Sequence, residues 1–276
     1  MAITAKDVNK LRQMTGAGMM DCKKALTEAE GDFEKAVELL RKKGQKVSAS
    51  RADRETSEGV IFTKTVNDGT KGVLISFTCE TDFVAKNEDY IALGQSIIDA
   101  AAEHNPADIA ALKALKTGDL TFEEKITEAT GRIGEKLEIS HYEILEGDAV
   151  VEYVHSNKKL GVLVALKNTN GANVEEAGKD VAMQIAAMNP VAVDKSGVDA
   201  ETVEKEIEIG KEQARQEGKP EQIIEKIAQG KLQKFFKENT LLPQSFVKDN
   251  SLTIEQYLNG VSKGLTVSNF KRVTIG

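Results

Sequence analysis

The sequence predicts an α+β protein: an N-terminal bundle of three helices, then a duplicated β-β-α…β core with antiparallel sheets and a projecting antiparallel helical hairpin. Three observations lead to this fold class. Apolar residues follow the helical period at the start of the chain. From Gly59 onward, β-branched and aromatic runs alternate with turn residues. The pattern of the first hairpin then returns at a constant offset of 89 residues.

The first three helices are expected within residues 3–43. Thr4 has the side chain of an N-cap, a glycine-rich loop separates the first helix from the second, and Asp32 caps the third. Apolar residues recur at helical spacing along the third helix, and Gly44 is expected to end it. The polar stretch at residues 46–57 is typical of a linker, which can be helical.

The first copy of the core opens with a predicted β-hairpin. Two runs rich in β-branched residues, 60–66 and 72–78, flank the turn residues Asn67-Asp68-Gly69-Thr70. A helix is expected to follow, up to about Glu103. The remaining segments of this copy are helical stretches at residues 106–116 and 122–134 and a strand at 136–145.

The same series returns in the second half of the chain. Gly161-Val162-Leu163-Val164 repeats Gly72-Val73-Leu74-Ile75, and a helix follows each hairpin. An insertion interrupts the second copy, where Gly218 ends one charged helix and Pro220 begins the next. The expected segments are strands at 149–156 and 161–167, a helix at 174–188, a helical arm at 199–238 and a final strand at 265–275.

These patterns divide the chain into four expected parts. Two copies of one unit imply two related subdomains, because a solenoid needs more repeats. A core of about forty residues is small, and such bundles usually serve as docking modules. The parts are a helical domain at 1–45, a linker at 46–57, core subdomain N at 58–146, and core subdomain C at 147–276 with the arm at 199–238.

The turn at Thr81–Asn87 links a predicted strand to a predicted helix, a place where a scaffold can present side chains. Its unusual residue is Phe83, which is large and apolar in an expected loop. One interpretation is structural: Phe83 packs under the helix, and Asn87 caps it. The equivalent turn of the second copy, residues 168–173, contains no Asp-Phe-Val, which favours a functional role for Phe83 instead.

Composition excludes several classes of function. The chain has 276 residues, a formal net charge of −7, no Trp and 5% aromatic residues, which disfavours direct nucleic-acid binding. No run approaches eighteen apolar residues and no signal or transit segment is apparent, so we expect a cytoplasmic protein that does not bind membranes.

The sequence contains no set of residues that predicts catalysis. Cys22 and Cys79 are far apart, and the histidines are scattered, so we expect no disulfide, metal site or cofactor. No nucleophile, base and orienting group occur together, and no glycine-rich phosphate loop is present. These observations favour a binding protein over an enzyme.

Two stretches carry a resemblance to a known family. They are Leu11–Leu26 together with Gly31-Asp32, and Cys79-Glu80-Thr81-Asp82-Phe83-Val84-Ala85-Lys86-Asn87. Both closely resemble signatures of the bacterial elongation factor Ts family, whose members are guanine nucleotide exchange factors for elongation factor Tu. The resemblance covers nearly the whole chain. It implies that the N-terminal bundle is a ubiquitin-associated-like domain and that the helical arm is a short coiled coil.

The resemblance also implies roles for particular residues. Asp82 and Phe83, with Thr81 and Val84, would displace Mg²⁺ from the partner's nucleotide site. Other positions that match partner contacts are Arg12, Met19, Met20, Ile133, Gly134 and His155. Methionines adapt to partner surfaces, although packing statistics lead us to expect one of Met19 and Met20 in the core. The expected partner is elongation factor Tu, and no covalent chemistry is implied.

Two rival classes of function stay open at this point. A ubiquitin-associated-like adaptor would bind another protein through residues 1–43 and would leave the Thr81–Asn87 turn unexplained. An enzyme would use Cys79 with His141 or His155. The sequence also leaves the oligomeric state open, with a homodimer and a 2:2 complex among the alternatives.

Overall fold

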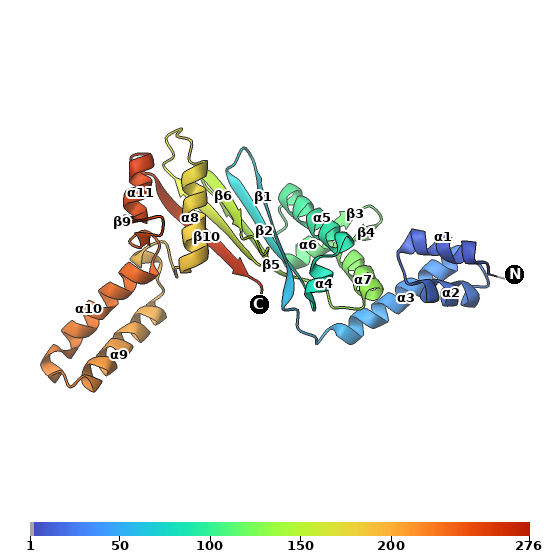
Figure 1. Ribbon diagram of the computed structural model, residues 1–276, viewed down its shortest axis with the longest axis horizontal. Coiled ribbons are helices and arrows are strands. Elements are labelled where there is room, and N and C mark those ends of the chain that lie inside the picture. Colours follow the sequence, from blue (N-terminus) through green and yellow to red (C-terminus); the bar gives the residue numbers. More distant parts are fainter. Residues whose placement is uncertain (1–2) are drawn as a thin grey trace. The chain divides into compact units, whose positions relative to one another are not determined.

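The computed structural model describes residues 3–276, which fold into two compact units (Figure 1). The first unit contains the chain up to Phe62, Ile75–Tyr142 and Thr274–Gly276, and the second contains Thr63–Leu74 and Glu143–Val273. The finer division into four parts stays a prediction. The mixed helix and sheet composition confirms the α+β class. Within residues 3–276, the apolar stretches of the helices fall short of what a membrane span needs.

The N-terminal bundle begins the first unit. Its helices are α1 (Ala5–Thr15), α2 (Met19–Glu28) and α3 (Phe33–Arg51). The predicted N-caps are confirmed: Thr4 and Asp7 form a capping box, and the carboxylate of Asp32 accepts a hydrogen bond from the backbone of Lys35. The core of this bundle consists of Val8, Leu11, Cys22, Ala25, Leu26, Ala29 and Ala36.

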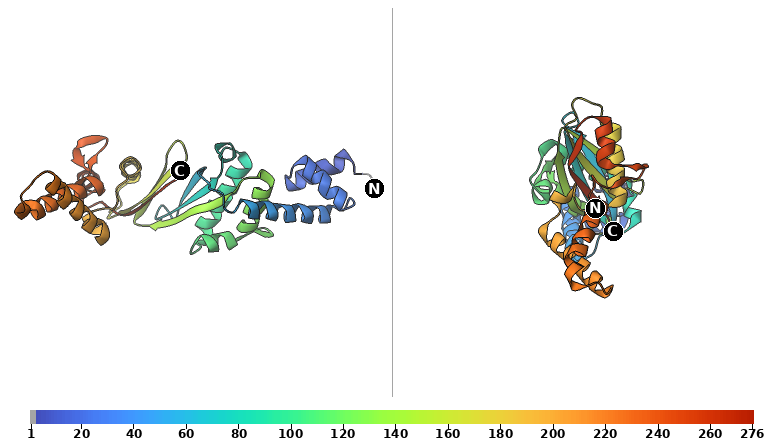
Figure 2. Two further views of the ribbon diagram at one scale, coloured as in Figure 1. Left: turned by 90° about the horizontal axis from the view of Figure 1, so that it is seen from below. Right: turned by 90° about the vertical axis from the view of Figure 1, so that its left-hand side faces the viewer.

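The prediction that Gly44 ends the third helix is wrong. Helix α3 continues through Gly44 to Arg51, and Figure 2 shows it as one long helix. Gly44 lies against Gly131 of helix α7 (Phe122–Ile133), and a Cβ atom built on Gly131 would meet the Cα of Gly44 at 2.3 Å. Glycine therefore serves here to bring two helices into close contact, a tertiary demand that outweighs its unfavourable helix propensity of about 1 kcal/mol.

The first sheet has the strand order β1-β2-β5. Its strands are β1 (Glu58–Val66), β2 (Lys71–Cys79) and β5 (Glu138–Glu146), and every residue of the central strand β2 is buried. The predicted hairpin turn is confirmed, with positive φ at Asn67, Asp68 and Gly69. The helices of this copy are α4 (Asp82–Ala85), α5 (Glu88–His104), α6 (Ile109–Ala114) and α7 (Phe122–Ile133).

The second sheet repeats this arrangement, with the strand order β10-β7-β6. Its strands are β6 (Ala149–Val154), β7 (Leu160–Lys167) and β10 (Thr266–Thr274). Strands β6 and β7 pair antiparallel with Val151 opposite Val164. Helix α8 (Glu175–Met188) packs on this sheet and contributes Val181 and Ile185 to the core.

The duplication extends further than the sequence pattern predicted. Helix α11 (Ile254–Val261), in a stretch for which we made no prediction, precedes β10 as α7 precedes β5. Thr121 and Thr253 each form a capping box at the start of these helices. Small hairpins come before both: β3 (Lys116–Thr117) with β4 (Leu120–Thr121), and β8 (Ser245–Phe246) with β9 (Asp249–Thr253).

The predicted helical arm is confirmed as an antiparallel pair within the second unit. Helices α9 (Ala200–Gln216) and α10 (Glu221–Asn239) follow the short 3₁₀ helix η1 (Lys195–Gly197). They pack through a small buried core that includes Ala214 and Leu232. The half-buried Lys211 of α9 forms ion pairs with Glu208 of the same helix and with Glu225 of α10, each at 3.1 Å, so the second pair joins the two helices.

Candidate functional site

Phe83 is the most exposed large apolar side chain among the residues that the structure describes, with 83% of its surface accessible. It lies on α4, a single helical turn in which Ala85 is buried and Val84 is half-buried. The turn is therefore anchored by Ala85 while Phe83 points into solvent. The structural interpretation, in which Phe83 packs under the following helix, is wrong.

The residues around Phe83 have defined partners. The Asp82 carboxylate accepts a hydrogen bond from Lys86 Nζ at 2.6 Å, one helical turn later, and this bond raises the pKa of Lys86. Asn87 is the N-cap of α5, as predicted, because its Oδ1 accepts from the backbone of Asp89 at 2.9 Å and of Tyr90 at 3.3 Å. The stretch Thr81–Asn87 thus contains the short helix α4 and the N-cap of α5.

Two carboxylates hold the start of this turn. Glu135 accepts hydrogen bonds from the backbone N–H of Thr81 at 2.9 Å and from its Oγ1 hydroxyl at 2.7 Å. Glu80 accepts from the backbone N–H of Lys136 at 2.7 Å and from Arg54 at 2.9 Å. Burial favours a raised pKa for Glu80, but these hydrogen bonds outweigh it and lower the pKa below its ordinary value.

In the second copy, the equivalent turn is also hydrogen-bonded to the loop before the last strand, but through amides instead of carboxylates. Asn168 donates from Nδ2 to the carbonyl of Gly264 at 3.1 Å, and Asn170 donates to the carbonyl of Lys263 at 3.2 Å. Gly264 precedes β10 as Gly134 precedes β5, and both have positive φ. The second copy thus ties the same two loops together but has no helix between them that corresponds to α4.

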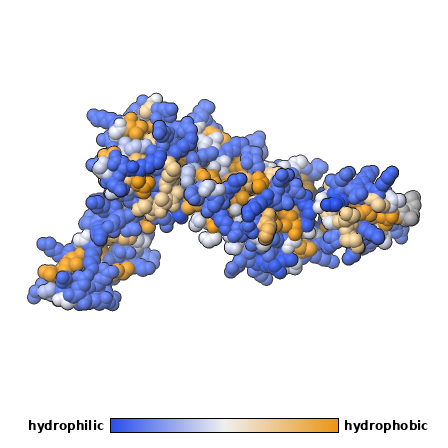
Figure 3. All heavy atoms as spheres, viewed as in Figure 1, coloured by the Kyte–Doolittle hydropathy of each residue, from blue (hydrophilic) through white to orange (hydrophobic). Residues whose placement is uncertain are grey.

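The three N-terminal positions matched by resemblance all lie on the surface. Arg12 is exposed on α1, and Met19 and Met20 at the start of α2 are 52% and 64% exposed. The expectation that one of the two methionines is in the core is therefore wrong. Helix α2 begins at Met19, directly after its N-cap Gly18, and its buried stripe consists of Cys22, Ala25 and Leu26. Figure 3 shows apolar residues among hydrophilic ones on the visible face of this bundle.

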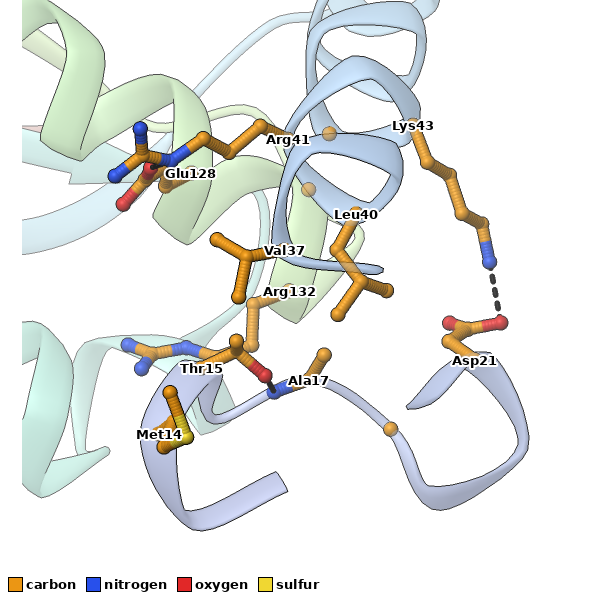
Figure 4. Close-up of a pocket in the computed structure, with 13 residues that line it drawn as sticks. Met14, Thr15, Ala17, Asp21, Val37, Leu40, Arg41, Lys43, Glu128 and Arg132 are labelled. Carbon is orange, nitrogen blue, oxygen red and sulfur yellow. Dashed lines mark hydrogen bonds and ion pairs between the residues drawn. The ribbon is translucent and has the colours of Figure 1, made fainter. Parts of the chain in front are cut away.

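A small cavity of about 160 Å³ lies where this bundle meets α7 (Figure 4). Arg41 of α3 pairs with Glu128 of α7 at 2.9 Å, and Lys43 pairs with Asp21. The Arg132 side chain runs so close to Gly16 that a Cβ there would meet its guanidinium at 2.6 Å. The loop between α1 and α2 thus packs against Arg132, the residue before Ile133.

The remaining predicted positions lie at turns. Ile133 ends α7 and is half-buried, and Gly134 is its C-cap with φ of 85°. Because Glu135 follows directly and bonds Thr81, the structure brings this pair close to the Phe83 turn. His155 is exposed in the β6–β7 hairpin of the second unit, where its Nδ1 is 2.9 Å from the hydroxyl of Tyr153.

The described residues offer little support for covalent chemistry. Cys79 is fully buried, its Sγ donates to the carbonyl of Thr81 at 3.2 Å, and burial raises its pKa to about 11. A thiol that stays protonated at neutral pH is a poor nucleophile, which argues against the cysteine-enzyme alternative. No group of His, Cys, Asp and Glu within residues 3–276 has the arrangement of a metal site.

Comparison with known proteins gives a consistent result. The family model described as "Elongation factor TS" matches residues 80–276. Over its whole length the chain is 56% identical to all of the elongation factor Ts of Amoebophilus asiaticus. It is 58% identical to that of Cytophaga hutchinsonii and 54% identical to that of Christiangramia forsetii, with 99% of each chain covered.

Proposed function

Since the chain belongs to the elongation factor Ts family of translation elongation factors, we propose that it binds GDP-bound elongation factor Tu and promotes release of GDP, so that GTP can bind. The observation that carries this proposal is Phe83, a large apolar side chain held out into solvent on a fixed turn. An isolated protein gains nothing from this exposure. Burying such a side chain in a partner contributes roughly 1.5–3 kcal/mol.

Asp82 and Phe83 act on the partner's nucleotide site in this proposal. Phe83 inserts between elements of elongation factor Tu near its Mg²⁺ site, and Asp82 brings a negative charge beside it. Thr81 and Val84 support them, since Thr81 fixes the start of the turn and Val84 is half-buried next to Phe83 in the chain. Displacement of Mg²⁺ weakens the hold on GDP because the cation no longer offsets the phosphate charge.

Docking of the partner uses the surrounding surface. Met19 and Met20 provide flexible apolar contacts and Arg12 a charged one on the N-terminal bundle. Ile133 and Gly134 extend the surface beside the Phe83 turn, and His155 of the second unit presses on the phosphate-loop side of the nucleotide site. Such a mechanism makes or breaks no covalent bond in either protein.

Exchange of this kind needs only a difference in affinity. The factor binds nucleotide-free elongation factor Tu more tightly than the GDP-bound form, so each tenfold difference shifts the equilibrium by about 1.4 kcal/mol. Linkage is reciprocal, so GTP binding weakens the complex and releases the factor. The same protein can therefore act on many partner molecules.

The adaptor alternative rests on one observation, the exposed methionines of the N-terminal bundle. It gives no role to Phe83 or to the bonds that hold its turn. Wild-type protein that neither binds elongation factor Tu nor accelerates its release of GDP would favour the adaptor.

The test is release of a fluorescent GDP analogue from elongation factor Tu, followed by stopped flow. Wild-type protein is expected to accelerate release, and Asp82→Ala with Phe83→Ala is expected to remove at least nine-tenths of that acceleration, an effect of about 1.4 kcal/mol or more. Release at the spontaneous rate with wild-type protein contradicts the proposal.

The matched control is Ile209→Ala, which removes an exposed apolar side chain from the arm. It is expected to leave the acceleration unchanged. Thermal unfolding of the Phe83→Ala variant should match wild type within about 0.5 kcal/mol, because truncation of an exposed side chain removes little packing.

A further inference from the structure

We propose that Glu135 is a positioning residue for Phe83, and that it acts together with Glu80 as a carboxylate clamp on the turn that presents this side chain. The clamp is defined as Glu80, Thr81, Glu135 and Lys136. The inference rests on the proposed function only for its effect on exchange. Its structural part, that the clamp holds Phe83 in one orientation, can be tested without any partner.

The clamp is reciprocal. The carboxylate of Glu135 receives both donors of Thr81, its N–H and its hydroxyl, at 2.9 Å and 2.7 Å. The carboxylate of Glu80 receives the N–H of Lys136 at 2.7 Å. The pair Glu80-Thr81 thus gives one carboxylate and one backbone N–H to the pair Glu135-Lys136, and receives the same from it. Hydrogen bonds to ionised acceptors are about twice as strong as neutral ones, so this junction is firmly fixed.

Arginines from the end of α3 and the segment after it reinforce the clamp. Arg54 donates to Glu80 at 2.9 Å, and the guanidinium of Arg51 lies 3.8 Å from the same carboxylate. The side chain of Glu80 is only 15% exposed, so solvent screens these interactions less than at an open surface. Glu80 therefore remains ionised and keeps its orientation at neutral pH.

The turn needs this support because it cannot stabilise itself. Helix α4 has four residues, far fewer than an isolated helix needs. Thr81 occupies its N-cap position but forms no capping bond with its side chain. The hydroxyl that could cap α4 is instead given to Glu135. The start of the turn is thus fixed from outside, and Asp82 and Phe83 follow directly.

The second copy shows that a tie between these loops belongs to the duplicated framework. There the side-chain amides of Asn168 and Asn170 donate to backbone carbonyls of the loop before β10. These are neutral bonds, and the apolar residues that directly follow them, Ala172 and Val174, are not exposed. The stronger, charged version occurs in the copy that carries Phe83, which indicates that the clamp serves its presentation.

The expected consequence is pre-organisation. A partner that receives a fixed Phe83 does not have to order the turn on binding, so the interaction energy is available to act on the nucleotide site. Loss of the clamp is expected to lower the acceleration of GDP release about tenfold at limiting protein concentration.

The partner-free test uses the absence of Trp from the sequence. In the Phe83→Trp variant, the single indole reports its own mobility by time-resolved fluorescence anisotropy. Adding Glu135→Ala is expected to increase the amplitude of fast depolarisation, and adding Glu135→Gln to restore most of the rigid signal, because its amide can still accept from the N–H of Thr81 and pair with the hydroxyl. Unchanged anisotropy in the Glu135→Ala background overturns the inference.

The exchange test is a double-mutant cycle of Glu135→Ala and Phe83→Ala. Positioning predicts a loss of about tenfold for Glu135→Ala alone and no further loss when Phe83 is already truncated. Equal losses in both backgrounds would mean a general structural effect and contradict positioning. Glu123→Ala, which removes an exposed carboxylate from α7, is the matched control and should change neither readout.

The two hypotheses fail in different ways. If wild-type protein does not accelerate release, the proposed function is wrong, and the anisotropy still decides whether the clamp holds Phe83. If wild type accelerates release and Glu135→Ala does so equally, the proposed function stands and the positioning role is overturned.

Discussion

Phe83 combines an exposed apolar side chain with a backbone whose neighbours are fixed by hydrogen bonds. Exposure alone is common on protein surfaces, since roughly half of any surface is apolar. Here the buried Ala85, the capping side chain of Asn87 and the carboxylate of Glu135 surround it within one short segment. At the scale of single residues, the candidate site is an exposed projection held by these contacts and not a pocket.

Glu80 makes the same segment sensitive to acid. Its pKa is lowered in the folded protein, so the unfolded chain binds more protons between the folded pKa and the ordinary value of about 4.3. The stability that Glu80 contributes is fully present above that ordinary value and is lost as the pH falls through the folded pKa.

We therefore expect the unfolding free energy of wild type to fall below about pH 4.3 more steeply than that of Glu80→Gln. Urea unfolding at pH 7 and at about pH 3.5 measures this difference. The variant should be less stable than wild type at pH 7, by about 1–2 kcal/mol, and the gap should narrow in acid. If the difference in unfolding free energy between wild type and Glu80→Gln widens in acid, the pKa of Glu80 is not lowered by folding.

The pairing of α3 with α7 is the decisive contact at the scale of elements. Gly44 and Gly131 let the two helix backbones approach, and the ion pair of Arg41 with Glu128 lies beside them. The long helix that leaves the N-terminal bundle is thereby joined to the helix whose end leads into Ile133, Gly134 and the clamp.

Gly131→Ala is expected to destabilise the protein by about 1–3 kcal/mol, although alanine is the better helix former by about 1 kcal/mol. The reason is that the new Cβ would meet the backbone of Gly44 at 2.3 Å. Chemical denaturation of both proteins measures the effect.

Gly230→Ala is the matched control for that substitution. Gly230 also lies inside a helix, α10, but a Cβ built there has nothing within 4 Å. This variant should gain about 0.5–1 kcal/mol from helix propensity alone. If both variants gain stability, close packing of α3 on α7 is not what Gly131 provides.

The whole molecule is built from one unit used twice and then modified. Each copy has a three-stranded sheet with its second strand in the centre, a helix after the hairpin and a capped helix before the last strand. The first copy adds the Phe83 turn, and the second adds the helical arm. Between Ala192 and Thr240 the chain closes on itself through a parallel bridge, so the arm enters and leaves at one place.

If a Gly/Ser linker of about eight residues replaces residues 199–238, the rest of the protein should stay folded. The chain between Ala192 and Thr240 then still has about a dozen residues, which is the length that a parallel connection needs. Circular dichroism should show fewer helical residues, and the cooperative unfolding midpoint should stay within about 3 °C of wild type.

The control is a variant that keeps the arm and carries the same linker in its loop at residues 217–219. It shows the effect of the linker alone. A broad, non-cooperative transition in the shortened protein alone would show that the arm supports the core.

Local patterns allowed most elements to be predicted. Caps at Thr4, Asp32 and Asn87 and the turn at residues 67–70 were all identified correctly, because each is decided by side-chain and backbone preferences of a few neighbouring residues. The hairpin of β8 with β9 and helix α11 were missed. The Leu-Thr-Ile-Glu-Gln start of α11 matches the Leu-Thr-Phe-Glu-Glu start of α7, but the inserted arm separates the two by more than the offset of 89 residues that relates the hairpins.

The sequence by itself determined the fold class, the duplication and the segment on which the proposed function depends, since these follow from periodicity and from motifs within short windows. Only the tertiary structure decided that Phe83 is exposed, that α3 continues through Gly44, and that Glu135 holds Thr81. Each of these depends on a contact between residues far apart in the chain, such as Gly44 with Gly131, and a local pattern carries no information about which distant groups will meet.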